Sequence, residues 1–449
     1  MKLLFCCAEY WPSVGGVQEV MRQIAEQMVK AGHEVTVATS THPKRAAKLH
    51  NGVRIAEFRI GGNLVDGLYG EANRYRDFMT KFDGDAILIK AAQQWSFDAL
   101  WPVLDSIQVR KVFIPCGFSA LYEPRFAGYF AGMPKILRAF DHLIFYSEKY
   151  RDIDFARSHG ISNYSIIPNG ASELEFGRAA DGKLRAKLGI APDDFLFLSV
   201  GSPVRGKGHR EVGEAFAQMD VGVRNATLIL NGRWSERERR PLWPVLRLLL
   251  RPASWRKGLI FLYRKGWRSL WEQLFPRVRP LLETDAVPLA NDAGRATEFR
   301  AGTKRVLYLD LPREDVVSAF LEADLFVFAS MIEYSPLVLF EAAAAGTPFL
   351  TVPVGNSREI VRWTGGGWIC PAEVDERGYT KVSPAVLARE MEKAVRSPEY
   401  LRELGETSHR AWRECFTWAK IAQSYERILR GEAVTSPAIS EVAEAVTRE

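Results

Sequence analysis

Two glutamates, Glu333 and Glu341, lie eight positions apart on either side of an apolar segment, and a run of alanines follows the second. The residues just before them, 325–329, form a short apolar run with the length of a strand. This order predicts a loop and a helix N-terminus at the carboxyl end of a strand, where α/β sheets bind ligands. Free backbone N–H groups there favour an anion such as phosphate, and a carboxylate on the helix can accept hydrogen bonds from ribose hydroxyls.

Two glycine-rich loops add further candidates. Gly15 and Gly16 follow the first apolar run, and a G-x5-K-G loop with Gly201, Lys207 and Gly208 follows a later one. Taken singly, each has an ordinary structural explanation, because a tight turn needs glycine and a lysine is usually solvated. The hypothesis of a ligand site therefore rests on the ordered set of motifs.

Two other reactive side chains can be explained by structural roles that involve no reaction. Cys116 has no base beside it in the sequence, so we interpret it as a buried packing thiol rather than a nucleophile. His209 follows the G-x5-K-G loop, where it is either a helix-start residue or a neighbour of a bound diphosphate.

The elements around these residues alternate between short apolar runs and helix-like segments. Runs with the length of strands lie at 3–8, 35–38, 86–89, 112–114, 143–146 and 165–167, and again at 195–200, 227–230, 305–309, 325–329 and 349–352. Strands that alternate with helices indicate open, mostly parallel sheets. We therefore predict an α/β fold with two Rossmann-like, doubly wound domains that face each other across a cleft.

The same pattern suggests where the parts begin and end. We expect an N-terminal domain over 1–180 on the acceptor side and a C-terminal domain over 181–410, interrupted by a basic insert over 233–285. A last helix is expected over 411–430, with packing back on the N-terminal domain as one arrangement. The small, polar and acidic residues 431–449 are expected to form a loose tail.

The composition is that of an ordinary globular chain and excludes fibrous or disordered classes. Of the 449 residues, 47% are hydrophobic and 25% are charged. The five cysteines show no C-x-x-C spacing, so neither a disulfide framework nor a zinc site is expected, which favours a reducing, cytoplasmic location. The N-terminus is interpreted as a strand rather than a signal peptide, and no apolar stretch is long enough to predict a membrane-spanning helix.

Basic charge is concentrated in the insert. Residues 233–279 hold thirteen Arg or Lys, three acidic residues and five of the twelve tryptophans, which gives this segment a net charge of +10. Trp267, Leu270, Trp271 and Leu274 recur at helical spacing. We favour a peripheral contact of 240–279 with a membrane surface, and two alternatives stay open: a nucleic-acid contact, or a helical excursion that packs on its own domain or on a second subunit.

With these motifs in view, the chain resembles the retaining nucleotide-sugar glycosyltransferases of family 4, which have the GT-B fold. The resemblance extends over roughly 1–430, apart from the insert. The motifs that carry it are G-G-V at 15–17, I-P-N-G at 167–170, G-x5-K-G at 201–208, Glu-x7-Glu at 333–341 and V-G-N-S-R-E-I-V at 354–361.

The resemblance implies a role for each candidate residue. Glu333 would face the donor sugar, Glu341 would hold the ribose hydroxyls, and Lys207, with Arg205 in the same loop, would neutralise the diphosphate. Backbone groups and glycines that would cradle the diphosphate are Ser335, Leu337 and Val338 from one side and Gly15 and Gly16 from the other. The family needs no metal and no cofactor besides the donor, and its reaction is thought to be a displacement on one face of the sugar.

Three positions depart from the family pattern. Ser202 stands where an arginine is common, and Tyr334 stands in place of a glycine after the first glutamate, where it is expected to narrow the sugar pocket. The stretch F-I-P-C-G-F-S places Cys116 or Gly117 where the N-terminal domain often has a histidine.

We therefore expect a glycosyltransferase that moves a sugar from a nucleotide-diphosphate donor to a glycan or a lipid-linked glycan. A role in cell-surface polysaccharide assembly at the inner face of the membrane fits the resemblance and the insert. The alternatives are a catalytically silent binding or scaffold protein and a sugar-nucleotide epimerase. Nucleic acid is not expected as a partner, because the rest of the chain is net negative.

Overall fold

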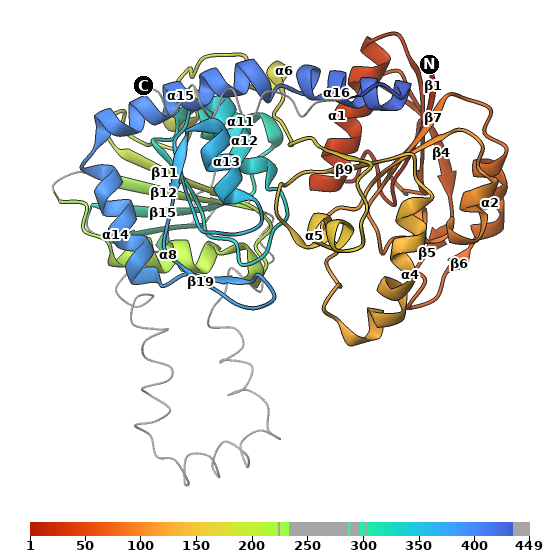
Figure 1. Cartoon of the computed structure of the whole chain (residues 1–449). Helices are drawn as coiled ribbons and strands as arrows, with labels where there is room; N and C mark the ends of the chain where they lie inside the picture. Colours follow the sequence, from red (N-terminus) through yellow and green to blue (C-terminus); the bar gives the residue numbers. More distant parts are fainter. Residues whose placement is uncertain (223–224, 233–285, 288–296, 302, 434–449) are drawn as a thin grey trace, which may run out of the picture.

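The computed structural model describes residues 1–222, 225–232, 286–287, 297–301 and 303–433. Two eight-stranded sheets lie side by side, one in each half of the chain (Figure 1). This arrangement confirms the predicted α/β fold with two Rossmann-like units. The insert at 233–285, with its 240–279 segment, and most of the tail at 431–449 lie outside the described residues.

The first sheet defines the N-terminal half. In spatial order its strands are β10 (Tyr164–Ile166), β9 (His142–Phe145), β8 (Arg110–Ile114), β7 (Ala86–Lys90), β1 (Lys2–Cys6), β2 (Glu34–Ser40), β4 (Val53–Phe58) and β3 (Leu49–His50). All neighbours pair in parallel except β3 with β4. The strand order reverses between β1 and β7, which places the loop after β1, with its two glycines, at a topological switch point.

The second sheet defines the C-terminal half and repeats this plan. Its order is β13 (Ala286–Val287), β14 (Thr297–Ala301), β15 (Lys304–Leu309), β12 (Ala226–Asn231), β11 (Phe195–Val200), β16 (Leu325–Phe328), β17 (Phe349–Thr351) and β18 (Gly367–Ile369). β14 runs antiparallel to both of its neighbours, β13 and β15, and the other neighbouring strands of this sheet pair in parallel. Here the order reverses between β11 and β16, so the G-x5-K-G loop and the Glu-x7-Glu element follow adjacent strands. Two small hairpins complete the strands: β5 (Ile60–Gly61) with β6 (Tyr69–Gly70), and β19 (Glu373–Val374) with β20 (Thr380–Lys381).

Helices connect the strands and cover the sheets. In the N-terminal half they are α1 (Gly16–Lys30), α2 (Ala72–Thr80), α3 (Trp95–Asp98), η1 (Trp101–Ser106), η2 (Pro124–Phe126), α4 (Ala127–Arg138) and α5 (Arg151–Ser158). The connection and the C-terminal half hold α6 (Glu173–Phe176), α7 (Lys183–Lys187), η3 (Arg205–Lys207), α8 (His209–Gln218), α11 (Arg313–Glu322), α12 (Leu337–Ala345), α13 (Ser357–Thr364), α14 (Pro384–Val395), α15 (Pro398–Cys415) and α16 (Trp418–Arg430).

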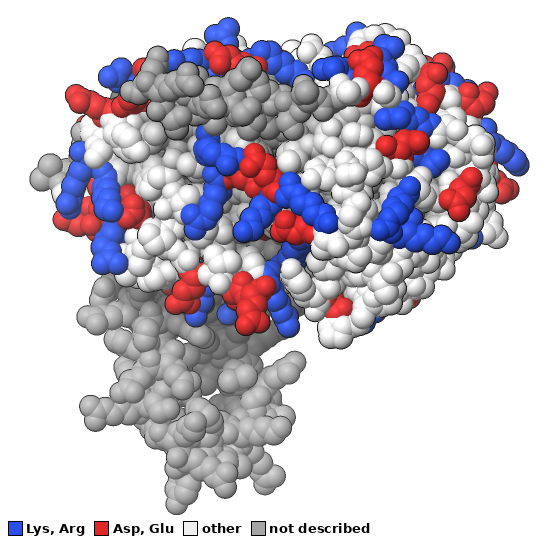
Figure 2. Space-filling view, viewed as in Figure 1, with Lys and Arg blue, Asp and Glu red and all other residues white. Residues whose placement is uncertain are grey.

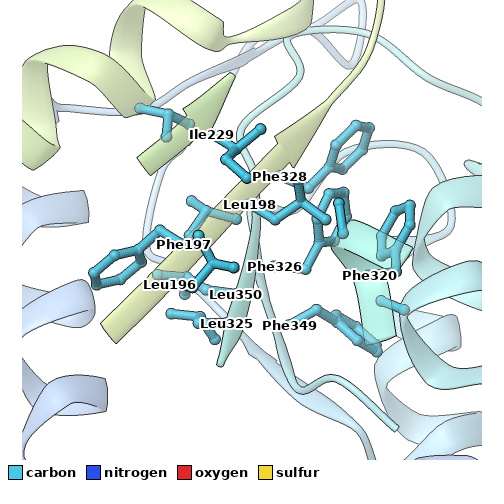
Figure 3. Packing of buried hydrophobic residues seen from close by; sticks show 14 of the residues in the cluster. Leu196, Phe197, Leu198, Ile229, Phe320, Leu325, Phe326, Phe328, Phe349 and Leu350 are labelled. Atoms are coloured by element: carbon cyan, nitrogen blue, oxygen red, sulfur yellow. The ribbon is translucent and has the colours of Figure 1, made fainter. Parts of the chain in front are cut away.

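Each sheet is buried between apolar layers. Phenylalanine and leucine side chains from β11, β16 and β17 meet in the core of the C-terminal half, as Figure 3 shows for Leu198, Phe326 and Phe349. The N-terminal sheet has one cluster on each face, and one of them contains residues of both α1 and α16. Strands buried on both faces are the reason that the sequence shows continuous apolar runs rather than alternation.

The end of the chain differs from the single helix expected over 411–430. Helix α15 ends at Cys415, and α16 begins after Thr417, whose hydroxyl accepts a hydrogen bond from the Lys420 N–H at 3.4 Å. Between them the Phe416 carbonyl accepts the Ala171 N–H at 3.0 Å. The helix breaks at this point because the chain crosses from one half to the other, and α16 lies beside α1 on the N-terminal sheet (Figure 1).

Candidate active site

Two loops from adjacent strands build the floor of the site. The loop after β11 holds residues 201–208, and the loop after β16 holds residues 329–336. The Gly206 carbonyl accepts the Met331 N–H at 2.8 Å and the Ser330 hydroxyl at 3.0 Å. Gly208 has φ +75°, and a methyl group there would collide with the Ala329 carbonyl oxygen, so this close approach needs glycine.

These loops bring two of the predicted catalytic residues together. Lys207 Nζ lies 2.5 Å from Glu333 Oε1, and the Ser330 hydroxyl oxygen lies 3.0 Å from the same carboxylate oxygen. Both side chains are largely but not fully buried, at 32% and 17% exposure. Arg205, the third predicted catalytic residue, is exposed on the same loop. The site therefore holds a cation and a carboxylate that already form an ion pair, and both side chains remain partly exposed to solvent.

The predicted diphosphate cradle joins the two halves. A methyl group at Gly16, the first residue of α1, would lie 3.9 Å from Leu337 Cδ1, at the start of α12. Gly15, Gly16, Ser335, Leu337 and Val338 thus lie at or next to two helix N-termini that approach each other. Both N-termini present free N–H groups, so the gap between them favours an anion.

The I-P-N-G turn supports this cradle, a role that its sequence did not reveal. Asn169 Nδ2 donates to the Ser335 carbonyl at 3.0 Å, and a side chain at Gly170 would collide with the Phe416 carbonyl. Within the described residues, the buried Asn169 Oδ1 and Ser335 Oγ have no hydrogen-bond partner. Buried polar atoms without partners are costly, which is consistent with a ligand that completes them.

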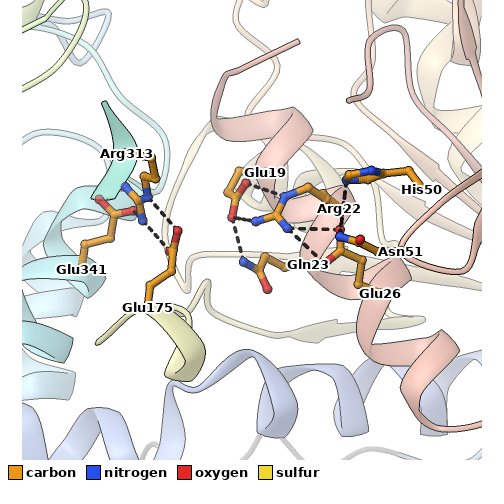
Figure 4. A network of polar contacts seen from close by, with 9 residues as sticks. All are labelled: Glu19, Arg22, Gln23, Glu26, His50, Asn51, Glu175, Arg313 and Glu341. Carbon is orange, nitrogen blue, oxygen red and sulfur yellow. Dashed lines mark hydrogen bonds and ion pairs between the residues drawn. The ribbon is translucent and has the colours of Figure 1, made fainter. Parts of the chain in front are cut away.

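Glu341 lies in an ion-pair network with two residues that the sequence analysis missed. Arg313 joins Glu341 at 2.6 Å and Glu175 at 2.8 Å (Figure 4). Burial alone would lower the pKa of Arg313, but the two carboxylates outweigh that effect and hold its pKa above the ordinary value. Across from this network, Figure 4 shows Glu19 and Arg22 of α1, which pair at 2.6 Å.

The side chain of Tyr334 joins the two halves. Its ring crosses to the N-terminal half and packs beside Tyr146 and Tyr150, with ring centroids 5.5 and 4.7 Å away, and a narrowing of the sugar pocket stays a prediction. A methyl group at Gly117 would lie 3.1 Å from the Tyr334 ring. The two departures from the family pattern, at 334 and 117, are therefore spatial neighbours.

Cys116 and His209 both lie in buried environments, which fit the structural roles considered for them from the sequence. Burial raises the pKa of the Cys116 thiol, which makes it a poor nucleophile. His209 is buried at the start of α8, and its Nε2 lies 3.1 Å from the Gly201 carbonyl. Lys90 was missed: it is buried at the end of β7, donates to Tyr146 Oη at 2.6 Å, and has its pKa lowered to about 8 by burial.

The part of the chain that the structure describes holds neither a metal-binding cluster nor a membrane-spanning helix. No group of three or more His, Cys, Asp or Glu side chains in this part of the chain is arranged to hold a metal ion. Among the helices described here, none combines the length and apolar character needed to cross a lipid bilayer.

Comparison with known proteins places these features in a family. A model for "Glycosyltransferase Family 4" matches residues 14–173, and a model for "Glycosyl transferases group 1" matches residues 294–410. No curated protein matches the sequence significantly.

Among solved structures, a sucrose-phosphate synthase from Thermosynechococcus elongatus is 17% identical, with a TM-score of 0.65 over 96% of this chain and 98% of that one. Anabaena HepE in complex with UDP and glucose is 15% identical, with a TM-score of 0.62 over 96% and 100% of the two chains. WaaG, a glycosyltransferase involved in lipopolysaccharide biosynthesis, is 18% identical, with a TM-score of 0.58 over 96% and 100%. These likenesses extend over both halves and show a shared GT-B fold.

The two family models match different halves and together span more than half of the chain, and the fold agrees with them. The chain therefore belongs to the family 4 glycosyltransferases with the GT-B fold.

Proposed function

We propose that this chain is a retaining glycosyltransferase that moves a sugar from a nucleotide-diphosphate donor to a glycan or a lipid-linked glycan. The observation that carries the proposal is the Lys207–Glu333 pair, 2.5 Å apart, beside the N-terminus of α12. A cation next to free helix N–H groups suits a diphosphate, and a carboxylate beside them suits a sugar hydroxyl or the anomeric centre.

The chemistry follows from where charge develops. As the bond between sugar and diphosphate breaks, the leaving group gains negative charge, which Lys207 and the N-termini of α1 and α12 stabilise without reorganising. We propose that Arg205 adds a second cation from the same loop. No metal and no cofactor besides the donor are required in this scheme, and the leaving phosphate helps to deprotonate the acceptor on the same face of the sugar.

The donor's nucleoside is assigned to the network around Glu341. This carboxylate is mostly buried and already oriented by Arg313, which leaves its second oxygen for ribose hydroxyls. The structures of HepE with UDP and with UDP-glucose make uridine nucleotides the first donors to test.

The acceptor and the cellular role are further parts of the proposal. We propose that the acceptor belongs to a cell-surface polysaccharide and that the enzyme works peripherally at the inner face of the membrane, through residues 240–279. The involvement of WaaG in lipopolysaccharide biosynthesis supports the first part, and the charge and tryptophan content of the insert supports the second. On the face seen in Figure 2, basic and acidic side chains are interspersed over both halves. The described residues on this face therefore form no continuous basic surface of the kind that binds nucleic acid.

Replacement of Glu333 tests the reaction. Glu333→Ala should lower the turnover of sugar transfer at least tenfold while nucleotide affinity changes much less, because the side chain is assigned to the sugar rather than to the nucleotide. Glu406→Ala, an exposed glutamate on α15, is the matched control and should transfer at the wild-type rate.

The outcomes separate the proposed function from its alternatives. Unchanged turnover in Glu333→Ala would remove the role assigned to this residue. A wild-type protein that binds a donor but neither transfers nor hydrolyses it is the catalytically silent binding protein, and conversion of the nucleotide sugar without an acceptor would indicate an epimerase. The anomeric configuration of the product, compared with that of the donor by NMR, tests retention.

A further inference from the structure

Tyr334 belongs to the C-terminal half, but most of its side-chain partners lie in the N-terminal half. Its ring lies beside the rings of Tyr146 and Tyr150, which follow β9. The ring also packs against the apolar cluster of the N-terminal sheet. A residue in the loop that carries Glu333 thus anchors that loop to the opposite half.

The N-terminal half provides a slot for this ring. Gly117 has φ +91°, a conformation that favours glycine, and a methyl group there would lie 3.1 Å from Tyr334 Cγ and 3.1 Å from Tyr150 Cε1. Any larger side chain at 117 would take the space that the ring occupies. The bulky residue at 334 and the missing side chain at 117 therefore fit together as a pair.

The phenol of Tyr334 contacts two groups of the N-terminal half. It accepts the Tyr146 N–H at 3.0 Å and interacts with the carboxylate of Asp152. Asp152 is fully buried, and it accepts the N–H groups of Gly117 at 2.7 Å and Ile153 at 2.9 Å. A buried carboxylate held by two backbone donors is rigid, so it offers the phenol a fixed neighbour.

The backbone next to Glu333 is held from both sides. Tyr150 Oη donates to the Glu333 carbonyl at 2.6 Å, and the Asn356 N–H donates to the Tyr334 carbonyl at 2.9 Å. Asn356 Nδ2 also donates to the Tyr146 carbonyl at 2.8 Å. The direction of the Glu333 side chain toward Lys207 thus depends on a peptide clamped between the two halves.

We propose that Tyr334 is a positioning residue: by seating its ring beside Gly117 and its phenol on Asp152, it makes contact between the halves a condition for the orientation of Glu333. The inference rests on the proposed function, in which Glu333 faces the reacting sugar. It adds a device that this chain builds from Tyr334, Gly117 and Asp152. Separation of the halves would remove the contacts that Tyr146 and Tyr150 make with this peptide, whereas Glu341 would keep its ion pair with Arg313 inside the C-terminal half.

The test compares turnover with donor binding. Tyr334→Phe keeps the ring but removes the hydroxyl that contacts the Tyr146 N–H and Asp152, so kcat for sugar transfer should fall at least tenfold, whereas the dissociation constant of the nucleoside diphosphate should stay within about twofold. Asp152→Asn removes the charged acceptor and should lower kcat in the same way. In the double variant the losses should not multiply, because both changes break one link. Tyr400→Phe, an exposed tyrosine on α15, is the control.

Thermal unfolding establishes whether each variant is folded. If Tyr334→Phe does not fold, Asp152→Asn serves as the test. A wild-type kcat in both variants would overturn the inference and leave the proposed function intact. Multiplicative losses in the double variant, or a fall in donor affinity equal to the fall in kcat, would also overturn it. A wild-type protein that transfers no sugar would contradict the proposed function, and the inference with it.

Discussion

At the scale of single residues, the site is defined by polar groups that hold one another in place. Glu341 is joined to Arg313, which also binds Glu175, and Glu333 is joined to Lys207. A free carboxylate in such a site would be flexible and strongly hydrated. These paired carboxylates are oriented before any ligand arrives, and this reduces the cost of ordering them on binding.

The sequence predicted both members of the Glu333–Lys207 pair, but of the network around Glu341 it predicted only Glu341 itself. Glu333, Lys207 and Glu341 belong to motifs with a recognisable order, and the structure brings them to one edge of the C-terminal sheet. Arg313 and Glu175 are ordinary charged residues 138 positions apart, so only the folded chain reveals that they meet. The same holds for Asp152 and Tyr150, whose importance depends on a ring from the other half.

Asp152 gives rise to a prediction about pH. Burial raises its pKa from 3.8 to about 6, although the Gly117 N–H and the Tyr334 phenol pull that pKa back. Because the folded pKa lies above the unfolded one, the contribution of this group to stability is fully present below about pH 4 and is lost as the pH rises through about 6. Asp152→Asn removes this dependence, so between pH 4 and 7 the free energy of unfolding of the wild type should fall by about 2 kcal/mol relative to that of the variant.

Denaturant titration at several pH values measures this difference. Asp154→Asn, an exposed neighbour on the same helix, should follow the wild-type curve throughout. Parallel curves for wild type and Asp152→Asn would show that the Asp152 carboxyl group is not perturbed in the fold.

At the scale of elements, the site depends on loops that approach closely. The apolar runs predicted nearly all central strands, because strands buried on both faces are apolar throughout. They did not predict β4 or the antiparallel strand β14, since strands with mixed polarity carry a weak signal. The break between α15 and α16 was also missed, because it is set by the contact between Phe416 and Ala171 rather than by a local helix breaker.

Gly208 gives the prediction at this scale. With φ +75° and the Ala329 carbonyl in the way, Gly208→Ala should destabilise the protein by at least about 2 kcal/mol and move the loop that carries Lys207. Gly206→Ala is the matched control in the same loop, because a methyl group there meets nothing within 4 Å, and it should change stability by less than about 0.5 kcal/mol. Equal stabilities of the two variants, measured by denaturant unfolding, would refute the close approach of the loops.

At the scale of the whole molecule, the two halves are joined by more than the chain connection. Helix α16 adds Ile421, Tyr425 and Ile428 to the apolar cluster of the N-terminal sheet, although it follows the C-terminal half in sequence. Tyr334 joins the halves on the side of the site. In the proposed reaction, these contacts would hold a donor on one half and an acceptor on the other in one geometry.

The basic insert gives a prediction about location. Full-length protein should sediment with vesicles that contain anionic lipid, more weakly as salt rises, because Arg and Lys near a charged surface contribute about 1 kcal/mol each at low screening. Replacing Trp267 and Trp271 by serine should weaken the binding, whereas Trp368→Ser, outside the insert, should not. Equal sedimentation with neutral and anionic vesicles, or none with either, would contradict the membrane proposal.

The central claim is that the gap between the α1 and α12 N-termini, with Lys207 and Glu341, binds the donor nucleotide. The most direct measurement is thermal unfolding of wild type and Glu341→Ala with UDP, GDP, ADP and their sugars. A ligand at a hundred times its dissociation constant stabilises by about 2.7 kcal/mol, which raises the Tm by several degrees. We predict a clear rise in wild-type Tm with the nucleotides of one base, and a rise less than half as large in Glu341→Ala. No rise with any nucleotide in folded wild-type protein, or an undiminished rise in the variant, would contradict the account.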